Sequence, residues 1–445
     1  MSLIDEILEP KNMLGAMMHV CEQKGAAGID GMSVDELKAR FPSEMGRIAQ
    51  EIREKRYTPS PVRRVYIPKP DGKKRPLGIP TVYDRTVQQA AAQKLSDIYE
   101  PVFSEYSYGF RPERGCRDAV AQAIVYMNEG YEWVIDLDIS KFFDTVCHDK
   151  LISILREQVS DPAVLHLVRA YLKAGVMEDG LVSATDMGVP QGGPLSVVLS
   201  NIYLDKLDKE LESRGLRFAR YADDCDIFVK SERSADRVMK SITSWIERKL
   251  FLKVNVEKSK VVRPPKSTFL GFTFWKSKDG WRCRPADDRK QRLRDKVKKI
   301  LLRKEAIARK LGDTVRLLNW TVGGWISYYS LGSMKNFLEE FGMWMRHKVR
   351  VVIMKQWKKP KTVYRNLKRL NAYLKAGFTD EQIYSVANSR LGLYHRCGMI
   401  TANVLISRKI MEQKNPAEQR PALLDPIRIY IRQRAKLFEK YASVM

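Results

Sequence analysis

The sequence predicts an α+β fold, in which short strands with alternating apolar residues lie among longer helical segments. In 216–230 apolar residues recur mostly at every second position on both sides of an acidic pair, and 133–139 is an apolar run interrupted by two acids. Helical spacing of apolar residues is typical of 84–99 and of most of the chain beyond 281. With 445 residues, of which 44% are apolar, the chain is long enough for a sizeable core and about three domains.

The N-terminal segment, 1–57, predicts short helices around a glycine-rich stretch, 24–31. Glycines permit turns and close approach of the backbone to another group. On sequence alone, a structural cap explains this composition.

Residues 59–85 predict a basic hairpin. Asp71-Gly72 is a strong turn signal, and it places Lys69 and Arg75 on opposite strands, close enough to hold one anion together. A triphosphate suits this pair, because an ammonium and a guanidinium can offset charge that develops on phosphate. A basic edge strand without a ligand explains the same residues.

An aromatic and arginine-containing cluster, 106–112, follows the amphipathic helix expected at 84–99. Such a cluster either steers a nucleic-acid strand by stacking or packs in the core. The residues alone leave both roles open for Arg111.

The stretch 133–139 predicts a buried strand that carries Asp136 and Asp138 on one face, because positions two apart point the same way. Carboxylates are costly on a buried strand unless they bind a cation. Two divalent ions about 3.5 to 4 Å apart, the arrangement that joins nucleotides, need carboxylates from separate strands. Phe143, five residues beyond Asp138, could pack under the sugar of a nucleotide and exclude a 2′-hydroxyl.

Residues 188–196 predict a loop whose glycines let the backbone approach a ligand, and Gln191 offers an uncharged donor and acceptor for a sugar or base.

The stretch 216–230 predicts a hairpin with Asp223 and Asp224 at its tip. Adjacent carboxylates repel each other, so the pair is costly unless a cation lies between them. An isolated Asp-Asp pair is most often an ordinary turn, and Asp138 supplies the further ligand that a metal site needs. Mg²⁺ prefers carboxylate and phosphate oxygens, so we expect two Mg²⁺ ions, with Mn²⁺ as an alternative ion.

Four motifs resemble, in order and spacing, those of reverse transcriptases encoded by bacterial group II introns. They are Tyr221-Ala-Asp-Asp224, Asp138-Ile-Ser-Lys-Phe-Phe-Asp144, Gly188-Val-Pro-Gln-Gly-Gly-Pro-Leu-Ser196 and Phe269-Leu-Gly-Phe272. One such short match can arise by chance, whereas all four in sequence are strong support. The similarity runs from near the N-terminus to past residue 400.

The resemblance implies a right-hand polymerase with fingers and palm, an all-α thumb and a small C-terminal DNA-binding region. It divides the chain into an N-terminal extension at 1–57, fingers and palm at 58–280, the RNA-binding maturase thumb at 281–365 and the DNA-binding region at 366–445. In the family the N-terminal extension touches template and intron RNA.

The resemblance also implies roles for individual residues, which we carry over position by position. The catalytic metal ligands would be Asp138, Asp223 and Asp224. The incoming dNTP would contact Lys69, Arg75, Phe143 and Gln191. Template or primer would contact Arg63, Arg111, Leu270 and Gly271.

Basic charge is concentrated in one part of the chain. The net charge is +26, and 281–370 holds 25 Lys or Arg against 7 Asp or Glu. Concentrated basic surface indicates a polyanionic partner, because neutralised phosphates release counterions. A solvated helix face explains single runs of lysine, but less well a block of this length. Gly324-Trp-Ile-Ser-Tyr-Tyr329 is the part of this block that most resembles the family's thumb.

Several classes of protein are not expected. No apolar run reaches the length of about 18 residues that a membrane span needs, and Met1–Asn12 alternates acids with apolar residues, unlike a signal peptide. The six cysteines are scattered and form no Cys-x-x-Cys pair, which argues against a disulfide framework or structural zinc. We therefore expect a cytoplasmic bacterial protein with no membrane partner.

Many relatives also carry a metal-bound endonuclease domain with paired cysteines. Beyond Cys283 this sequence holds only Cys397, with His347 and His395, so we expect no target-strand cutting by these residues.

The predicted activity is that of an RNA-directed DNA polymerase, a nucleotidyltransferase that uses dNTPs, an RNA template and a DNA primer or target. The same chain would bind its intron RNA and assist splicing and mobility. Two alternatives remain: a maturase that acts mainly in splicing, and a stand-alone relative recruited to defence or DNA repair. The sequence carries no signal for the oligomeric state.

Overall fold

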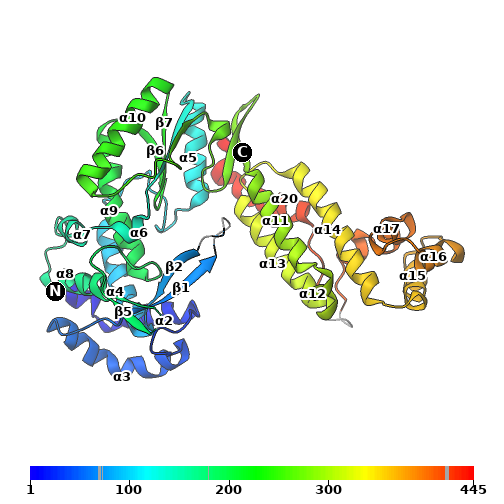
Figure 1. Cartoon of the computed structure of the whole chain (residues 1–445), viewed down its shortest axis with the longest axis horizontal. Coiled ribbons are helices and arrows are strands. Elements are labelled where there is room, and N and C mark those ends of the chain that lie inside the picture. Colours follow the sequence, from blue (N-terminus) through cyan, green and yellow to red (C-terminus); the bar gives the residue numbers. More distant parts are fainter. Residues whose placement is uncertain (69–71, 73, 179, 416–419) are drawn as a thin grey trace. The chain divides into compact units, whose positions relative to one another are not determined.

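The computed structural model describes residues 1–68, 72, 74–178, 180–415 and 420–445, and Figure 1 shows the order of their helices and strands. The chain divides into two compact units, Met1–Phe269 and Leu270–Met445. Helices outnumber strands, and most strand pairs are antiparallel, so the predicted α+β class is confirmed.

The first unit begins with three helices, α1 (Leu3–Ile7), α2 (Pro10–Glu22) and α3 (Val34–Arg53). A capping box fixes the start of α3, because the Ser33 hydroxyl accepts from the Glu36 N–H while the Glu36 carboxylate accepts from the Ser33 N–H. Apolar side chains of α2 and α3 join the core of this unit, with α2 packed against α3 and α4 (Val82–Tyr99).

A four-stranded sheet follows, with the order β2-β1-β4-β5. Strands β1 (Val62–Pro68) and β2 (Lys74–Ile79) form the predicted antiparallel hairpin, in which Ile67 lies opposite Arg75. The edge of β1 is completed by a second hairpin, β4 (Val176–Glu178) and β5 (Leu181–Ser183), and β4 runs parallel to β1. The sequence did not predict this second hairpin.

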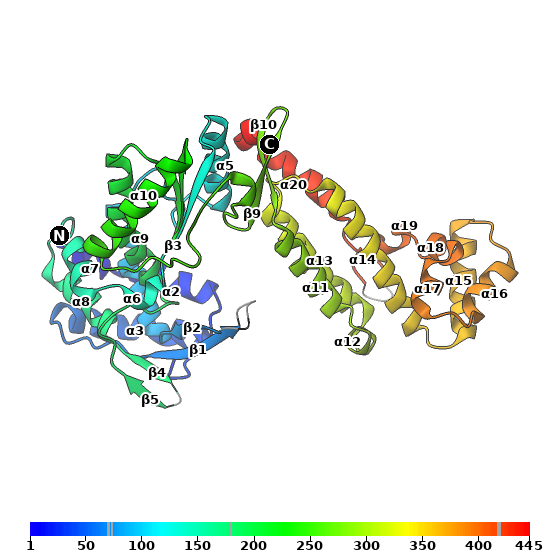
Figure 2. The same ribbon diagram turned by 45° about the horizontal axis from the view of Figure 1, so that its top comes forward.

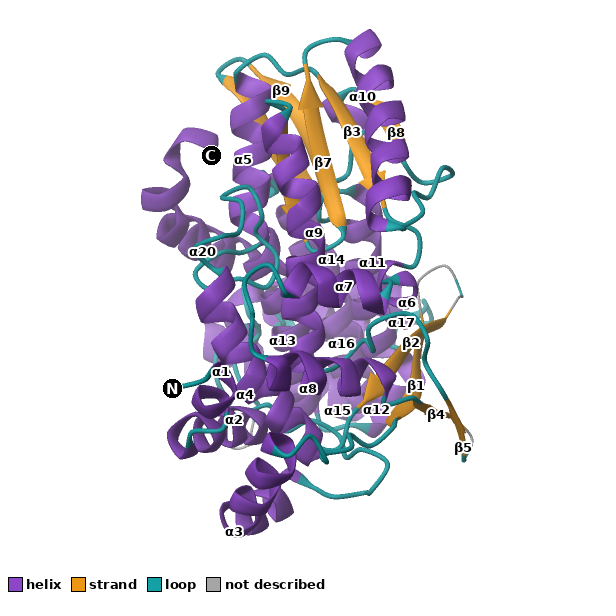
Figure 3. Cartoon of the chain, turned by 90° about the vertical axis from the view of Figure 1, so that its left-hand side faces the viewer, coloured by secondary structure: helices purple, strands orange, loops and turns teal. Residues whose placement is uncertain are grey.

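The second sheet of this unit has the order β6-β7-β3-β8 and is antiparallel throughout. Its strands are β3 (Trp133–Asp138), β6 (Arg217–Tyr221), β7 (Asp224–Val229) and β8 (Lys260–Val262). Figure 3 shows β3 and β7 side by side among the helices that pack on the sheet, α5 (Cys116–Asn128), α9 (Pro194–Ser213) and α10 (Glu232–Trp245).

Shorter elements complete the first unit. They are α6 (Phe142–Thr145), α7 (His148–Leu155), α8 (Pro162–Lys173), the π-helical turn η1 (Ile246–Leu250) and the 3₁₀ turn η2 (Pro264–Lys266). Apolar side chains of α4, α7, α8, α9 and the second sheet form one continuous core with those of α1 to α3.

The second unit opens with a hairpin, β9 (Phe272–Ser277) and β10 (Gly280–Pro285), and is otherwise helical (Figure 2). Its longer helices are α11 (Asp287–Ile300), α13 (Leu311–Tyr329), α14 (Lys335–Gln356), α15 (Pro360–Leu374) and α20 (Pro426–Tyr441). Its shorter helices are α12 (Arg303–Ala308), α16 (Asp380–Asn388), α17 (Leu393–Gly398), α18 (Ile400–Leu405), α19 (Arg408–Met411) and the 3₁₀ turn η4 (Ala442–Val444). Helix α13 packs against α11 and α20, and α14 also packs against α20.

The contact boundary at Phe269 groups the β9–β10 hairpin with the helices that follow it, whereas the division implied by the resemblance has a boundary after residue 280. Within the described parts of the chain, none of the helices combines the length and the apolar character that crossing a bilayer requires.

Candidate active site

Four carboxylates lie in two facing pairs on β3 and β7. Asp138 is directly opposite Asp224, and Asp136 is directly opposite Asp226. Because side chains alternate along a strand, all four belong to one face of the sheet. The predicted hairpin is present. Tyr221 pairs with Asp224, so Ala222 and Asp223 form its two-residue turn and Asp224 begins β7.

The site concentrates negative charge. Burial raises the pKa of the Asp224 carboxyl to about 6, and the charges of Asp223, Asp136 and Asp138 add to this rise. Burial also raises the pKa of Asp223, with Asp138 adding to the shift, and holds the pKa of Asp226 well above its usual range. The three predicted ligands therefore lie close enough to repel one another, which a bound cation would relieve.

Two lysines from the segment after η1 partly neutralise this charge. The Lys258 Nζ lies 3.3 Å from Asp138 Oδ2, and the Lys260 Nζ lies 3.6 Å from Asp136 Oδ2. The same segment is fixed to the end of β3, since the Asn255 N–H donates to the Asp138 carbonyl at 2.8 Å. Of these two lysines, Lys260 begins β8 and Lys258 precedes it.

The donor set fits magnesium, although the side chains are not gathered into a closed site. Among the residues that the structure describes, no three His, Cys, Asp or Glu side chains lie close enough to enclose a metal as they stand. Carboxylate oxygens from Asp138 and Asp224 face each other across two strands, and Asp223 lies in the adjoining turn. Such oxygens, left partly open for substrate phosphates, match the preference of Mg²⁺.

A cavity of about 380 Å³ holds two of the predicted nucleotide contacts, Phe143 and Gln191. Backbone bonds tie them together, because the Val189 N–H donates to the Phe143 carbonyl at 2.6 Å and the Gly78 N–H donates to the Gln191 carbonyl at 2.7 Å. Gly188 is required here: its φ is +91°, and a Cβ would lie 2.8 Å from the Phe143 oxygen. This loop therefore joins α6 to strand β2.

Of the two predicted triphosphate contacts, Lys69 and Arg75, the structure describes only Arg75. Lys69 lies outside the described residues. Arg75 is exposed on β2, and its positive charge lowers the pKa of Asp223, against the larger effect of burial. The guanidinium therefore acts electrostatically on the acidic turn.

Comparison with known proteins agrees with this geometry. Residues 67–274, which include all four acids, match the family described as "Reverse transcriptase (RNA-dependent DNA polymerase)", and residues 290–373 match "Group II intron, maturase-specific domain". Protein YkfC of Escherichia coli K12 is 34% identical over 299 residues, which cover 58% of this chain and 78% of YkfC. The chain belongs to the group II intron-encoded reverse transcriptases and maturases.

Other relatives of this family match over shorter parts of their length. The group II intron-encoded protein LtrA of Lactococcus lactis is 38% identical over 222 residues, which cover 48% of this chain and 36% of LtrA. The putative COX1/OXI3 intron 2 protein of Saccharomyces cerevisiae is 33% identical over 254 residues, which cover 56% of this chain and 28% of that protein. A chain of the solved "Partial Cas6-RT-Cas1--Cas2 complex" is 23% identical with a TM-score of 0.35, over 56% of this chain and 43% of that one.

In this group II-type reverse transcriptase, Arg63 anchors the N-terminal extension. Its Nη2 donates to the Ala27 carbonyl at 2.7 Å, and Arg85 of α4 donates to the neighbouring Ala26 carbonyl. Gly28 packs against the chain at Thr81, where a Cβ would lie 2.6 Å from the Thr81 Cα. The predicted template contact of Arg63 stays a prediction, and the glycine-rich stretch is held by β1 and α4.

The structure shows Arg111 bonded within the first unit. Its side chain is buried, and the guanidinium is bidentate to Glu100, with bonds of 3.0 Å and 2.7 Å to Oε1. The remaining N–H groups donate to the carbonyls of Ser104 and Ser107. These bonds hold the loop before α5, and the predicted template contact of Arg111 stays a prediction.

Leu270 and Gly271, the predicted primer contacts of the reverse transcriptase, form a turn in the second unit. Both have left-handed backbones, with φ of +51° and +82°, and the Tyr328 hydroxyl donates to the Leu270 carbonyl at 3.1 Å. A Cβ on Gly271 would lie 2.6 Å from the Tyr329 hydroxyl oxygen. Within the second unit, the Leu270–Gly271 turn thus contacts the end of α13.

The structure also has a cavity of about 730 Å³ that the sequence did not predict. It lies between α2, α4 and the start of α9, and it is lined by the amide side chains of Gln23, Gln89 and Gln93 and by Phe110. The Phe110 ring is half exposed and lies 6.1 Å from the ring of Tyr221, beside the acidic turn. The spacing of Gln89 and Gln93, one helical turn apart, was the available signal.

Proposed function

We propose that this chain copies RNA into DNA at the β6–β7 turn, with Asp138, Asp223 and Asp224 as the ligands of two Mg²⁺ ions. The observation that carries this proposal is the register of β3 and β7, which sets Asp138 opposite Asp224 beside the turn that holds Asp223. The family match over residues 67–274 supports the same activity.

Different side chains would bind the metal ions, bind the triphosphate and select the sugar. Bound Mg²⁺ supplies the positive charge that polarises the phosphate and lowers the barrier to attack by the primer 3′-hydroxyl. Asp138, Asp223 and Asp224 hold the ions, and Arg75 with Lys69 would hold the triphosphate. Phe143 excludes a 2′-hydroxyl from the cavity that it shares with Gln191.

We further propose that the chain binds intron RNA and assists splicing. Residues 290–373 match the maturase-specific domain, and they lie within the basic block 281–370. The helix α11 presents exposed Lys296, Lys298 and Lys299. The proposal also includes fingers and palm at 58–280, a thumb at 281–365, a DNA-binding region at 366–445 and a bacterial cytoplasmic location.

Primer extension on an RNA template tests the polymerase. Asp223→Asn should abolish extension in Mg²⁺ and leave RNA affinity unchanged, because the amide keeps the shape of the side chain but not its charge. Asp149→Asn is the matched control, since this aspartate is 82% exposed on α7. Extension by Asp223→Asn at the rate of the control would remove Asp223 from the ligand set.

A splicing assay separates the two activities. Charge reversal at Lys296, Lys298 and Lys299 should weaken intron RNA binding and splicing, whereas Asp223→Asn should splice normally. Charge reversal at the exposed Arg233, Arg237 and Lys240 of α10 is the control, because it changes the net charge by the same amount. Normal splicing by the α11 variant would refute the maturase role of this helix.

A further inference from the structure

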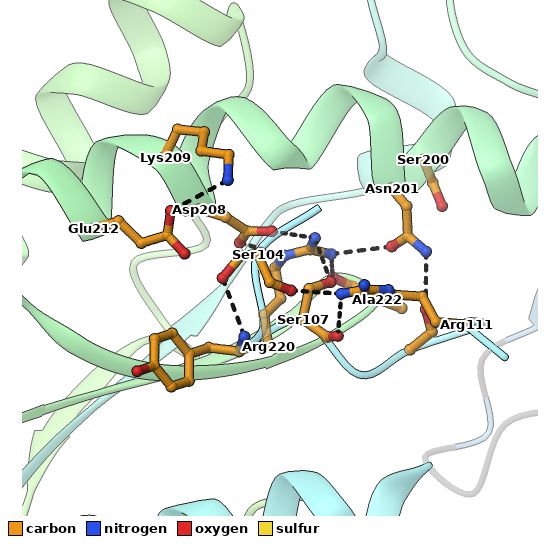
Figure 4. A network of polar contacts seen from close by, with 12 residues as sticks. Ser104, Ser107, Arg111, Ser200, Asn201, Asp208, Lys209, Glu212, Arg220 and Ala222 are labelled. Carbon is orange, nitrogen blue, oxygen red and sulfur yellow. Dashed lines mark hydrogen bonds and ion pairs between the residues drawn. The ribbon is translucent and has the colours of Figure 1, made fainter. Parts of the chain in front are cut away.

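Arg220 is wholly buried one residue before the Tyr221-Ala-Asp-Asp224 turn (Figure 4). Its Nε donates to Asp208 Oδ1 of α9 at 2.6 Å, and Nη2 donates to the other oxygen of the same carboxylate. Nη2 also donates to the Ser107 hydroxyl at 2.8 Å, while Nη1 donates to Asn201 Oδ1 at 3.2 Å. A guanidinium has five N–H donors, and the fifth serves the active site.

That fifth bond runs from Arg220 Nη1 to the carbonyl of Ala222 at 2.8 Å. Ala222 is the first residue of the two-residue turn and has a φ of +58°, a left-handed backbone that an alanine adopts only when its surroundings hold it there. The next two residues are the proposed metal ligands Asp223 and Asp224. The guanidinium therefore bonds directly to the backbone that carries both carboxylates.

The turn is supported from a second direction by Gly109. A Cβ on Gly109 would lie 2.4 Å from the Ala222 nitrogen, so only a glycine allows the loop to come so close. The Asn201 amide donates to the Gly109 carbonyl at 2.8 Å and accepts from Arg220, which links both supports to α9. The same loop is bonded to β6, because the Tyr108 N–H donates to the Arg220 carbonyl at 2.8 Å.

Stability alone does not explain this arrangement. A buried ion pair such as Arg220–Asp208 often contributes no more to stability than apolar residues of the same volume, because both charges lose their hydration. The side chain of Arg220 also points to the face of the sheet opposite the carboxylates, since it pairs with Cys225 and not with Asp224 or Asp226. It therefore touches neither metal nor substrate.

We propose that Arg220, with Asp208 as its counter-ion, is a positioning residue that fixes the Asp223 and Asp224 carboxylates for Mg²⁺ through the Ala222 carbonyl. The inference rests on the proposed function, because it concerns the same metal site. Mg²⁺ requires nearly ideal octahedral geometry, so a small displacement of the turn weakens its binding. Groups that orient metal ligands typically contribute about 10-fold to 100-fold in metal affinity or activity.

Arg220→Lys separates charge from geometry. Lysine keeps the positive charge beside Asp208, but its single ammonium cannot serve that carboxylate, Ser107, Asn201 and the Ala222 carbonyl together. We expect the Mg²⁺ concentration for half-maximal primer extension to rise by about tenfold or more. Calorimetric titration of the full chain with Mg²⁺ alone should show the same loss of affinity, with RNA affinity unchanged.

Arg350→Lys controls for the loss of a buried guanidinium, because Arg350 donates to the carbonyls of Ile406 and Cys397 within the second unit. Its Mg²⁺ affinity should equal that of the parent chain. A folded Arg220→Lys protein with unchanged Mg²⁺ affinity and unchanged half-saturation would overturn the inference.

Asn201→Ala decides the question if Arg220→Lys does not fold. It leaves the Arg220–Asp208 ion pair intact, and it removes both the link to Gly109 and the Asn201 bond to Arg220. Weaker Mg²⁺ binding by this variant supports the inference, and unchanged binding overturns it. If the parent chain binds Mg²⁺ but extends no primer, the polymerase proposal fails, while calorimetry still tests the positioning role.

Discussion

Replacing Asp224 with asparagine should stabilise the metal-free protein. The pKa of Asp224 is raised from its usual value of 3.8 to about 6, chiefly by burial and then by the neighbouring carboxylates, so its ionised form destabilises the folded state at neutral pH. A rise of this size in a fully buried group corresponds to about 3 kcal/mol. Because Asp224 is partly exposed to solvent, screening reduces our expectation to about 1 kcal/mol.

The pH dependence follows from the direction of the shift. The folded Asp224 carboxyl has a pKa of about 6, and in the unfolded chain its pKa is near 3.8. As the pH falls through this range, the folded protein takes up a proton at Asp224, and the parent protein is no longer destabilised by a buried charge. The advantage of Asp224→Asn should therefore be largest above about pH 6 and should disappear below about pH 4. In saturating Mg²⁺ the parent protein should be more stable than Asp224→Asn, because the ion stabilises the parent protein by binding its folded state.

Thermal unfolding in a chelating buffer at pH 7.5 measures this effect. A gain of about 1 kcal/mol corresponds to roughly 2 °C in Tm for a unit of this size. Asp149→Asn on α7 is the control, since its exposed carboxylate lies outside the acid cluster. An Asp224→Asn protein that melts at or below the parent temperature without Mg²⁺ would refute the electrostatic reasoning.

Three further changes test the site. Phe143→Ala should let the cavity accept ribonucleotides. Unchanged selectivity between rNTPs and dNTPs in primer extension would refute the proposal that Phe143 excludes the 2′-hydroxyl. Lys258→Ala should lower the Mg²⁺ concentration for half-maximal extension a few-fold, because an ammonium no longer competes for Asp138; a higher requirement would contradict this. Arg111→Ala should lower the free energy of unfolding by about 2 kcal/mol in a denaturant titration, since it leaves the Glu100 carboxylate unpaired. Template affinity should not change. Loss of template affinity without loss of stability would instead support the template contact of Arg111.

Sequence patterns found the acidic site because it is built from local signals. An apolar run predicted β3 and alternation predicted the β6–β7 hairpin. The antiparallel register of β3 and β7 then places Asp138 opposite Asp224. The pairing of Phe143 with Gln191 in one cavity was accessible only through the family resemblance, because it depends on backbone bonds between segments far apart in the chain.

The features that the sequence did not reveal share a physical cause. Arg111 lies among aromatic residues, and its partner Glu100 belongs to the turn after α4, so no local pattern indicated a buried ion pair. Strands β4 and β5 have three residues each, too few for a visible alternation. Arg220 looks like one more basic residue in the sequence, and only its contact with Asp208 reveals a buried charge.

The parallel pairing of β4 with β1 has a consequence for how the protein is made. The edge of β1 stays unpaired until β4 is synthesised, more than a hundred residues later and after β3 and the first proposed metal ligand. Until then the nascent chain exposes unpaired backbone groups that another chain could capture. A fragment that stops before Val176 should therefore aggregate, whereas one that continues through Ser183 has the strands to close this sheet.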